Sequence, residues 1–288
     1  MKKAGLKASL LIGVLLLTLV VLPLGCTSEA TSNLKVVTTT SLIASIVEKV
    51  GGDKVQVANI IPPAQCPGHF DVKPSDIQML ADAKLFLMHG WQGEMFSTDL
   101  IKSANNAELK VVILNIPGNW MTPTVQAQAV GNITSSLAEI DPQNASYYQN
   151  NANSQQDAIA AKGNGLKARL EAGNVSQINV ICSEQIAGFV QWAGFNVTAT
   201  YGRPEDLSIK QIQELIDQAK KAGVALVIDN LQSGFNAGEA MVKEIGAVQV
   251  TLSNFPGGFD DTGTWEKAIE KDVNLMLEAL ATYRGNSH

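Results

Sequence analysis

Short apolar, strand-like runs alternate with helical stretches along most of this sequence. Residues 34–40 form a β-branched run, and the helical pattern that follows over 41–50 stops at Gly51-Gly52. Further strand-like runs cover 55–61, 85–88, 111–114, 178–182, 197–200, 224–228 and 247–252. Strands separated by helices pair in parallel, and ligands of such sheets bind at the carboxyl ends of the strands. The alternation therefore predicts an α/β protein with two mostly parallel sheets flanked by helices.

A long helical pattern separates the two sets of strands. It extends over 124–172 and is predicted to split near Asp141-Pro142, because proline suits the start of a helix. Two glycines within 162–165 cost a helix roughly 2 kcal/mol relative to alanines, so a bend or fray is expected there. These boundaries predict a first lobe over 34–140, a linker helix over 141–173 and a second lobe over 174–288. Capping-box patterns at Ser75 and Ser208 mark two further helix starts.

The N-terminal segment is typical of an exported protein. Three lysines within the first seven residues precede an uncharged, Leu- and Val-rich run over 8–28. Residues 1–25 therefore resemble a secretory signal. Because Cys26 directly follows Gly25, it is the predicted site of lipidation, and 26–33 form a polar tether. The alternative is a transmembrane anchor, since the uncharged run is long enough to span a bilayer. Either reading places the body outside the cytoplasm.

Charge and motifs exclude several functions. The chain carries a formal charge of −6, and removal of residues 1–25 takes away three lysines and no acid, which leaves about −9 (18 − 27). No run of basic residues offers a nucleic acid a binding surface. The sequence also lacks the common phosphate-binding, dinucleotide-binding, metalloprotease and serine-hydrolase motifs.

His69 and Cys66 are the first candidate functional residues. Both lie in a Pro- and Gly-containing loop after a predicted strand, and imidazole and thiolate are good zinc ligands. The alternative is a loop histidine bonded to backbone beside a thiol that packs as a small apolar group.

Several segments carry a family resemblance. Residues 67–77, PGHFDVKPSDI, resemble the motif D-P-H-x-Y-E-P-[ST]-P-S-D-[IL] of the periplasmic zinc/manganese-binding lipoproteins of ABC transporters, the ZnuA/TroA-like solute-binding proteins. Three later segments resemble that family's A-D-L-[FV]-x-x-N-G, W-L-D-P and L-D-P-x-N-x-x-x-Y motifs: 81–90, 120–123 and 140–148. The resemblance implies two α/β lobes joined by a long linker helix. It also implies a monomeric binding protein, not an enzyme, that captures a divalent transition metal as cargo and delivers it to an ABC permease.

The resemblance also implies four metal-ligand positions, two of which are altered here. The first falls on His69, and the third falls on Glu184 in a stretch that resembles S-[HE]-x-A-F. The second, a histidine in the family, is Gly118, and the fourth, an aspartate, is Ser253.

These departures leave three interpretations open. In the first, Cys66 and His89 fill the empty positions, so that the candidate metal ligands are His69, Glu184, Cys66 and His89. In the second, the site takes a chelated metal or an organic ligand, and the cleft is lined by tryptophans at 91, 120 and 192. In the third, Cys66 and Cys182 form a disulfide, which an extracytoplasmic location permits.

Two further classes of function compete with solute binding. One is an extracellular enzyme with Cys66 as nucleophile and His69 as base, although a spacing of three residues in a loop suits such a pair poorly. The other is a metal-free adhesin or structural lipoprotein on the same fold. If His69 and Glu184 hold one metal ion, their side chains should lie within about 5 Å of each other, which is two metal–ligand bond lengths.

Overall fold

The computed structural model describes residues 33–91, 94, 96–234 and 238–286. The predicted signal segment 1–25, Cys26 and the predicted tether up to residue 32 lie outside the described residues. None of the helices in the described ranges is long and apolar enough to cross a membrane.

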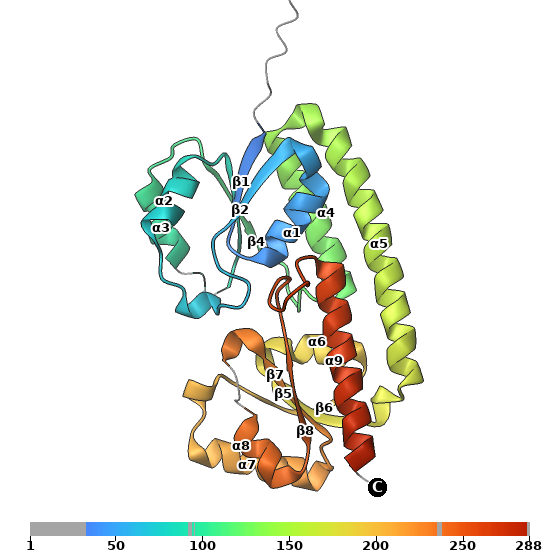
Figure 1. Ribbon diagram of the computed structural model, residues 1–288. Coiled ribbons are helices and arrows are strands. Elements are labelled where there is room, and N and C mark those ends of the chain that lie inside the picture. The colour runs from blue at the N-terminus through green and yellow to red at the C-terminus, as the bar shows by residue number, and fades with distance from the viewer. Residues whose placement is uncertain (1–32, 92–93, 95, 235–237, 287–288) are drawn as a thin grey trace, which may run out of the picture. The chain divides into compact units, whose positions relative to one another are not determined.

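Two parallel four-stranded sheets form the framework of the described chain (Figure 1). The first has the order β2-β1-β3-β4 and the second has the equivalent order β6-β5-β7-β8. The strands are β1 (Leu34–Thr38), β2 (Val55–Asn59), β3 (Leu85–His89), β4 (Lys110–Leu114), β5 (Asn179–Ser183), β6 (Asn196–Tyr201), β7 (Leu226–Asn230) and β8 (Val248–Leu252). The predicted fold class, two parallel-sheet lobes with a long helix between them, is confirmed.

Helices cover both faces of the first sheet, because its strands carry apolar side chains on both sides. Val36 of β1 packs in a core with α1 (Ser41–Gly51) and α4 (Pro123–Ile140). The next residue, Val37, points to the opposite face, where it packs with α2 (Pro74–Ala81) and α3 (Phe96–Ala104). We call this sheet with its four helices the first lobe.

The second sheet is covered in the same way. Val180 of β5 faces α6 (Ala187–Ala193) and α9 (Trp265–Asn286). Ile181, its neighbour in sequence, faces α7 (Ile209–Ala222) and α8 (Glu239–Ile245). This sheet with its four helices is the second lobe.

The long helix α5 (Ala145–Ala172) runs alongside both lobes (Figure 1). Its buried side chains, Tyr148, Ile159, Leu166 and Leu170 among them, belong to one apolar cluster that includes strands of both sheets. This core is continuous from one lobe to the other. Moving the lobes far apart would expose it, at about 25 cal/mol for each Å² of apolar surface.

The fray predicted within 162–165 is wrong, because α5 continues through these residues without a break. Gly163 is buried, and a Cβ placed on it would come 2.7 Å from Cγ of Pro123, the first residue of α4. The missing side chain therefore lets α5 approach α4 closely and does not interrupt the helix.

The two predicted capping boxes differ in outcome. At Ser208 the box is confirmed: its hydroxyl accepts from the backbone N–H of Gln211, and the Gln211 side chain accepts from the Ser208 N–H in return. At Ser75 the predicted start is wrong. Helix α2 begins at Pro74, and Asp76 accepts a 2.8 Å hydrogen bond from the backbone N–H of Lys73.

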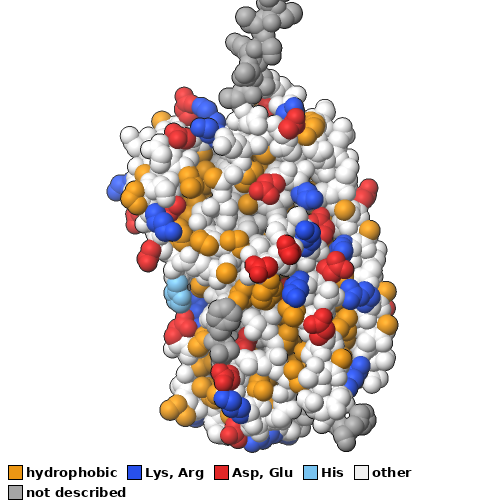
Figure 2. Space-filling model, viewed as in Figure 1, with side chains coloured by type: hydrophobic (Ala, Val, Ile, Leu, Met, Phe, Trp, Pro, Cys, Tyr) orange, Lys and Arg blue, Asp and Glu red, His pale blue; other side chains and the backbone are white. Residues whose placement is uncertain are grey.

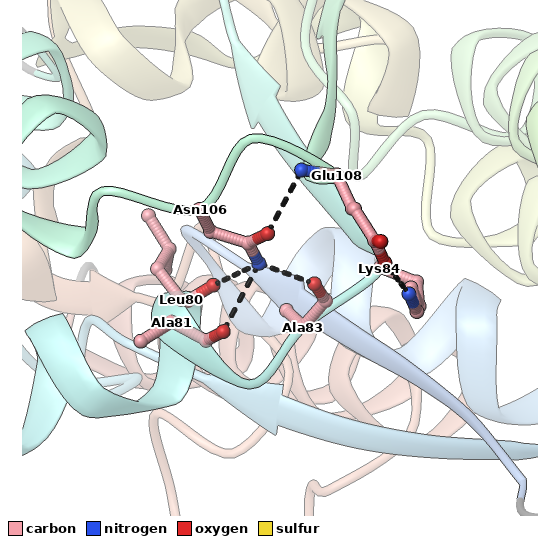
Figure 3. Close-up of polar contacts among 6 residues, drawn as sticks. All are labelled: Leu80, Ala81, Ala83, Lys84, Asn106 and Glu108. Atoms are coloured by element: carbon pink, nitrogen blue, oxygen red, sulfur yellow. Dashed lines mark hydrogen bonds and ion pairs between the residues drawn. The ribbon is translucent and has the colours of Figure 1, made fainter.

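Asn106 joins the end of α2 to the start of β4 (Figure 3). Its Nδ2 donates to the carbonyls of Leu80, Ala81 and Ala83 at 2.8–3.1 Å, and its Oδ1 accepts from the N–H of Glu108. The Glu108 carboxylate in turn pairs with Lys84, just before β3. This network lies at the amino ends of β3 and β4. It therefore stabilises the side of the first lobe that faces away from the carboxyl ends of the strands.

Candidate functional site

A pocket of about 310 Å³ lies where the carboxyl ends of the two sheets meet. From the first lobe, Cys66, Trp91 and Trp120 contribute to its wall. The second lobe contributes Gln185, Arg203, Asn230, Gln232, Asn254 and Phe255. These residues lie at the carboxyl ends of strands or in the loops that follow them, so the predicted placement of a ligand at the strand ends agrees with the pocket.

Neutral amides connect the lobes across this pocket. Nδ2 of Asn119 donates to Oδ1 of Asn254 at 2.8 Å and to the carbonyl of Gln185 at 3.1 Å. Nε2 of Gln232 donates to the carbonyl of Pro63 at 2.8 Å. Sequence reasoning missed these amides as a set, although Gln232 and Asn254 each lie two residues after a strand, which was the available signal.

The two altered ligand positions lie at or beside this pocket. Gly118 lines it, with a left-handed φ of 100°. Ser253 is buried, and its hydroxyl donates to the carbonyl of Phe255 and accepts from Gln232. Its backbone N–H donates to Asp272, whose pKa burial raises well above the usual range. Ser253 is thus engaged inside the protein, and Asn254 faces the pocket in its place.

His69 lies outside the described lining of the pocket. Its side chain is 59% exposed, and Nε2 lies 3.4 Å from a carboxylate oxygen of Glu205 in the second lobe. Glu184 occupies the other family ligand position that keeps a metal-binding side chain in this chain. It is also exposed, and its carboxylate accepts from Nε2 of Gln185 at 2.9 Å. Both residues occur near the rim of the pocket, on opposite lobes.

His89 lies beneath the pocket wall and is fully buried. Nε2 forms a 2.8 Å hydrogen bond with the Thr40 hydroxyl, and the ring stacks on Trp91 with centroids 3.6 Å apart. Trp120 contacts it edge-on at 4.4 Å. Burial holds the pKa of His89 well below its usual range, so the imidazole is neutral and supports Trp91 from behind.

Glu94 contributes a second buried titratable group close to His89. It is 1% exposed, and burial raises its pKa to about 8 despite the Thr39 hydroxyl and the backbone N–H of His89, which both lower it. Burial therefore disfavours the charged form of this carboxyl, which lies outside the described lining of the pocket.

The third interpretation, a disulfide between Cys66 and Cys182, is contradicted, because neither thiol is bonded to another cysteine of the described chain. Cys66 lines the pocket, whereas Cys182 points from β5 into the core shared with α6 and α9. Burial raises the pKa of Cys182 to about 12. An enzyme based on Cys66 and His69 also lacks support, because the imidazole is directed to Glu205 and the described contacts include no thiol–imidazole hydrogen bond.

The structure does not bring the four candidate ligands together. Among the described residues, no three His, Cys, Asp or Glu side chains are placed to hold one metal ion. Of the three tryptophans expected in the cleft, Trp91 and Trp120 line the pocket, while Trp192 stacks on Phe189 and lies in a separate surface hollow beside α4 and α5.

Charged side chains on the outside are mixed in sign. On the face drawn in Figure 2, Lys and Arg alternate with Asp and Glu and do not gather into a basic patch. That face has no surface of the kind that holds a nucleic-acid backbone.

The sequence model of a protein family described as "zinc-uptake complex component A periplasmic" (ZnuA) matches residues 36–279. The chain belongs to this family. It is similar to the metal ABC transporter substrate-binding lipoprotein SsaB of Streptococcus sanguinis, at 26% identity over 250 residues, which cover 78% of this chain and 80% of the relative. It is also similar to the iron-binding protein YfeA of Yersinia pestis, at 25% identity over 239 residues and 76% of each chain.

Solved structures share the fold of this ZnuA-family chain. The crystal structure of ZnuA superposes with a TM-score of 0.74 at 21% identity and covers 86% of this chain and 100% of that one. A structure of FpvC from Pseudomonas aeruginosa with Ni²⁺ superposes with a TM-score of 0.75 at 20% identity, covering 87% and 98%. The arrangement of two lobes and a long helix is therefore that of the family, and the amide-lined pocket lies between the lobes of this chain.

Proposed function

We propose that this chain is the extracytoplasmic solute-binding component of an ABC transporter, with a divalent transition metal of the zinc or manganese class as its cargo. The observation that carries the proposal is the pocket between the lobes, to which both lobes contribute side chains. A ligand held there contacts both lobes at once. Family membership and relatives named as metal and manganese substrate-binding lipoproteins support the metal.

The task of the site is capture and not chemical turnover. The described lining of the pocket offers no base beside the thiol of Cys66, and the Asn119–Asn254 bridge holds the lobes together over the ligand. A carrier needs this arrangement, since it must hold its cargo unchanged until an ABC permease accepts it.

The proposal includes export and attachment at the membrane. Residues 1–25 act as the signal, Cys26 carries a lipid and 26–33 form the tether, as the sequence predicts and as relatives named lipoproteins support. The monomeric body then comprises lobes over 34–140 and 174–288 and a linker helix over 141–173.

Of the four candidate metal ligands, one lines the pocket and three lie outside its described lining. Cys66 already lines the pocket. His69 would have to leave Glu205, and Glu184 would have to turn inward from the surface. His89 would have to release Thr40 before its Nε2 could bind a metal.

Metal content tests the proposal directly. The protein isolated from its own envelope should retain about one transition-metal ion per chain, measured by inductively coupled plasma mass spectrometry. Glu139→Gln, which removes a surface ion pair with Lys110, serves as a control and should retain the same amount. Absence of every transition metal, together with failure to bind Mn²⁺ or Zn²⁺ as the free ion or as a complex, would refute the proposal.

A further inference from the structure

The described lining of the pocket is poor in metal ligands. It includes no carboxylate and no imidazole, and Cys66 supplies the single side chain of strong metal-binding chemistry there. Zinc sites use four ligands, at least three of them from the protein. A bare ion in this pocket would be under-coordinated unless His69 and Glu184 left their present partners, so further ligands that arrive with the ion would complete the site without that rearrangement.

The pocket is also large for an ion. Its volume of about 310 Å³ falls in the range of small-molecule sites, about 300–1,000 Å³. Its walls include the faces of Trp91 and Phe255, one from each lobe, which are inclined by 9° with centroids 6.4 Å apart. Aromatic walls and amide groups are the lining that an organic ligand requires.

Arg203 is the charged side chain in the described lining. Its guanidinium reaches over the loop of the first lobe: a Cβ on Gly68 would lie 3.0 Å from Nη2. The acids nearby are engaged elsewhere, because Glu205 contacts His69 and Glu184 accepts from Gln185. No carboxylate pairs with Arg203 among the described residues, so its planar fork is available to a carboxylate of the ligand.

Asn230 adds a second unused group. It is 3% exposed, its Nδ2 donates to the Ser233 hydroxyl at 2.7 Å, and its Oδ1 has no hydrogen-bond partner among the described residues. A buried amide oxygen without a partner is costly. Asn230 lines the pocket, so a turn of its amide would bring this oxygen to a ligand hydroxyl that satisfies it.

We propose that the pocket recognises a small hydroxycarboxylate, free or as its metal complex, by pairing a carboxylate with Arg203 and a hydroxyl with Asn230. The inference rests on the proposed function and specifies the form in which the cargo arrives. The organic anion supplies the metal ligands that the pocket lacks, and Cys66 completes the coordination from the protein side.

Isothermal titration calorimetry of the purified protein tests this with four probes: Zn²⁺ alone, Mn²⁺ alone, citrate alone, and citrate with each metal. We expect citrate or its complex to bind at least about tenfold more tightly than the bare ion. Arg203→Met should weaken that binding about 10- to 100-fold, the scale of a charge-assisted pair, and should not weaken binding of the bare ion, because it removes a positive charge from the pocket. Tighter binding with metal than without it would identify the complex as the cargo, and equal binding would identify the free acid.

Two further variants distinguish recognition from folding. Arg203→Lys keeps the charge but loses the fork, so its affinity should fall between those of the wild type and Arg203→Met. Arg169→Met removes an exposed ion pair between Arg169 of α5 and Glu270 of α9, outside the pocket, and this variant should bind citrate as the wild type does.

Native mass spectrometry of protein from its own envelope covers acids other than citrate. It should show an organic acid that is released on denaturation. A bare ion at one per chain, or citrate binding that Arg203→Met leaves unchanged, would overturn the inference and leave the metal carrier standing. Failure of every metal, acid and complex to bind would remove the proposed function as well.

Discussion

Two glycines of α5, two residues apart, should respond to alanine in opposite directions. Gly163 faces α4, where a Cβ would lie 2.7 Å from Cγ and 3.0 Å from Cβ of Pro123. Gly165 is exposed and would place its Cβ in open space, with nothing within 4 Å. Both positions are helical, so the gain in helix propensity is the same for each, about 1 kcal/mol.

The packing around each glycine then decides whether alanine raises or lowers the free energy of unfolding. The proline ring is tied to the backbone at the start of α4 and cannot rotate away, so Gly163→Ala must push the two helices apart. Forcing an extra methyl group into a packed core costs about 1–3 kcal/mol. The expected net effect of Gly163→Ala is a loss of up to about 2 kcal/mol in the free energy of unfolding, while Gly165→Ala should gain about 1 kcal/mol.

Urea denaturation followed by tryptophan fluorescence measures both changes on the same protein. Gly165→Ala is the matched control, because it shares the helix, the substitution and the propensity gain. If Gly163→Ala stabilised the protein as much as Gly165→Ala does, the close approach of α5 to Pro123 would not be the reason for the glycine.

Three further predictions concern the polar network, a buried acid and the two thiols. Asn106→Ala should lower the free energy of unfolding by about 2 kcal/mol, because it removes the donor shared by three carbonyls, whereas Glu108→Ala removes only an exposed ion pair and should change it little. Burial raises the pKa of Asp272, so its contribution to stability is complete below its unfolded pKa near 4 and is lost as the pH rises. The stability of Asp272→Asn relative to the wild type should therefore increase from pH 4 to pH 8, and a difference that stays constant over this range would contradict the assignment. Iodoacetamide should label Cys66 well before Cys182, which is fully buried with a pKa raised to about 12, and bound cargo should slow labelling of Cys66. Equal labelling rates, by peptide mass spectrometry, would show that Cys66 does not line an accessible pocket.

Local patterns in the sequence were sufficient to predict the sheets. β-Branched runs and the glycines after them are short-range signals, and the eight predicted strands match β1 to β8. Helix α3 was not predicted, although Phe96, Leu100 and Ala104 recur at helical spacing in its sequence, FSTDLIKSA. It is stabilised by tertiary contacts, since Leu100 and Ala104 pack into the core beneath α2.

The candidate site was less predictable, because its residues come together only in three dimensions. Cys66 and Trp91 were expected near the cleft and line the pocket. Arg203 and Asn230 were missed, because each is an ordinary polar residue at or just after the end of a strand and no spacing marks it. Only the sheet topology, which collects the carboxyl ends of β6 and β7 at one edge, identifies them as neighbours.

The continuous core limits how the cargo can enter. Wide separation of the lobes would break the apolar cluster that α5 shares with both sheets, and each large side chain exposed there would cost about 1.5–3 kcal/mol. The bridges at the pocket are weaker individually: Asn119 with Asn254, Gln232 with Pro63, and the exposed contact of His69 with Glu205. Opening should therefore be confined to the pocket mouth, where neutral hydrogen bonds contribute only about 1 kcal/mol each. The side chains that enclose the pocket are neutral except for Arg203. Discrimination among cargoes should therefore depend on the anion that accompanies the metal more than on movement of the lobes.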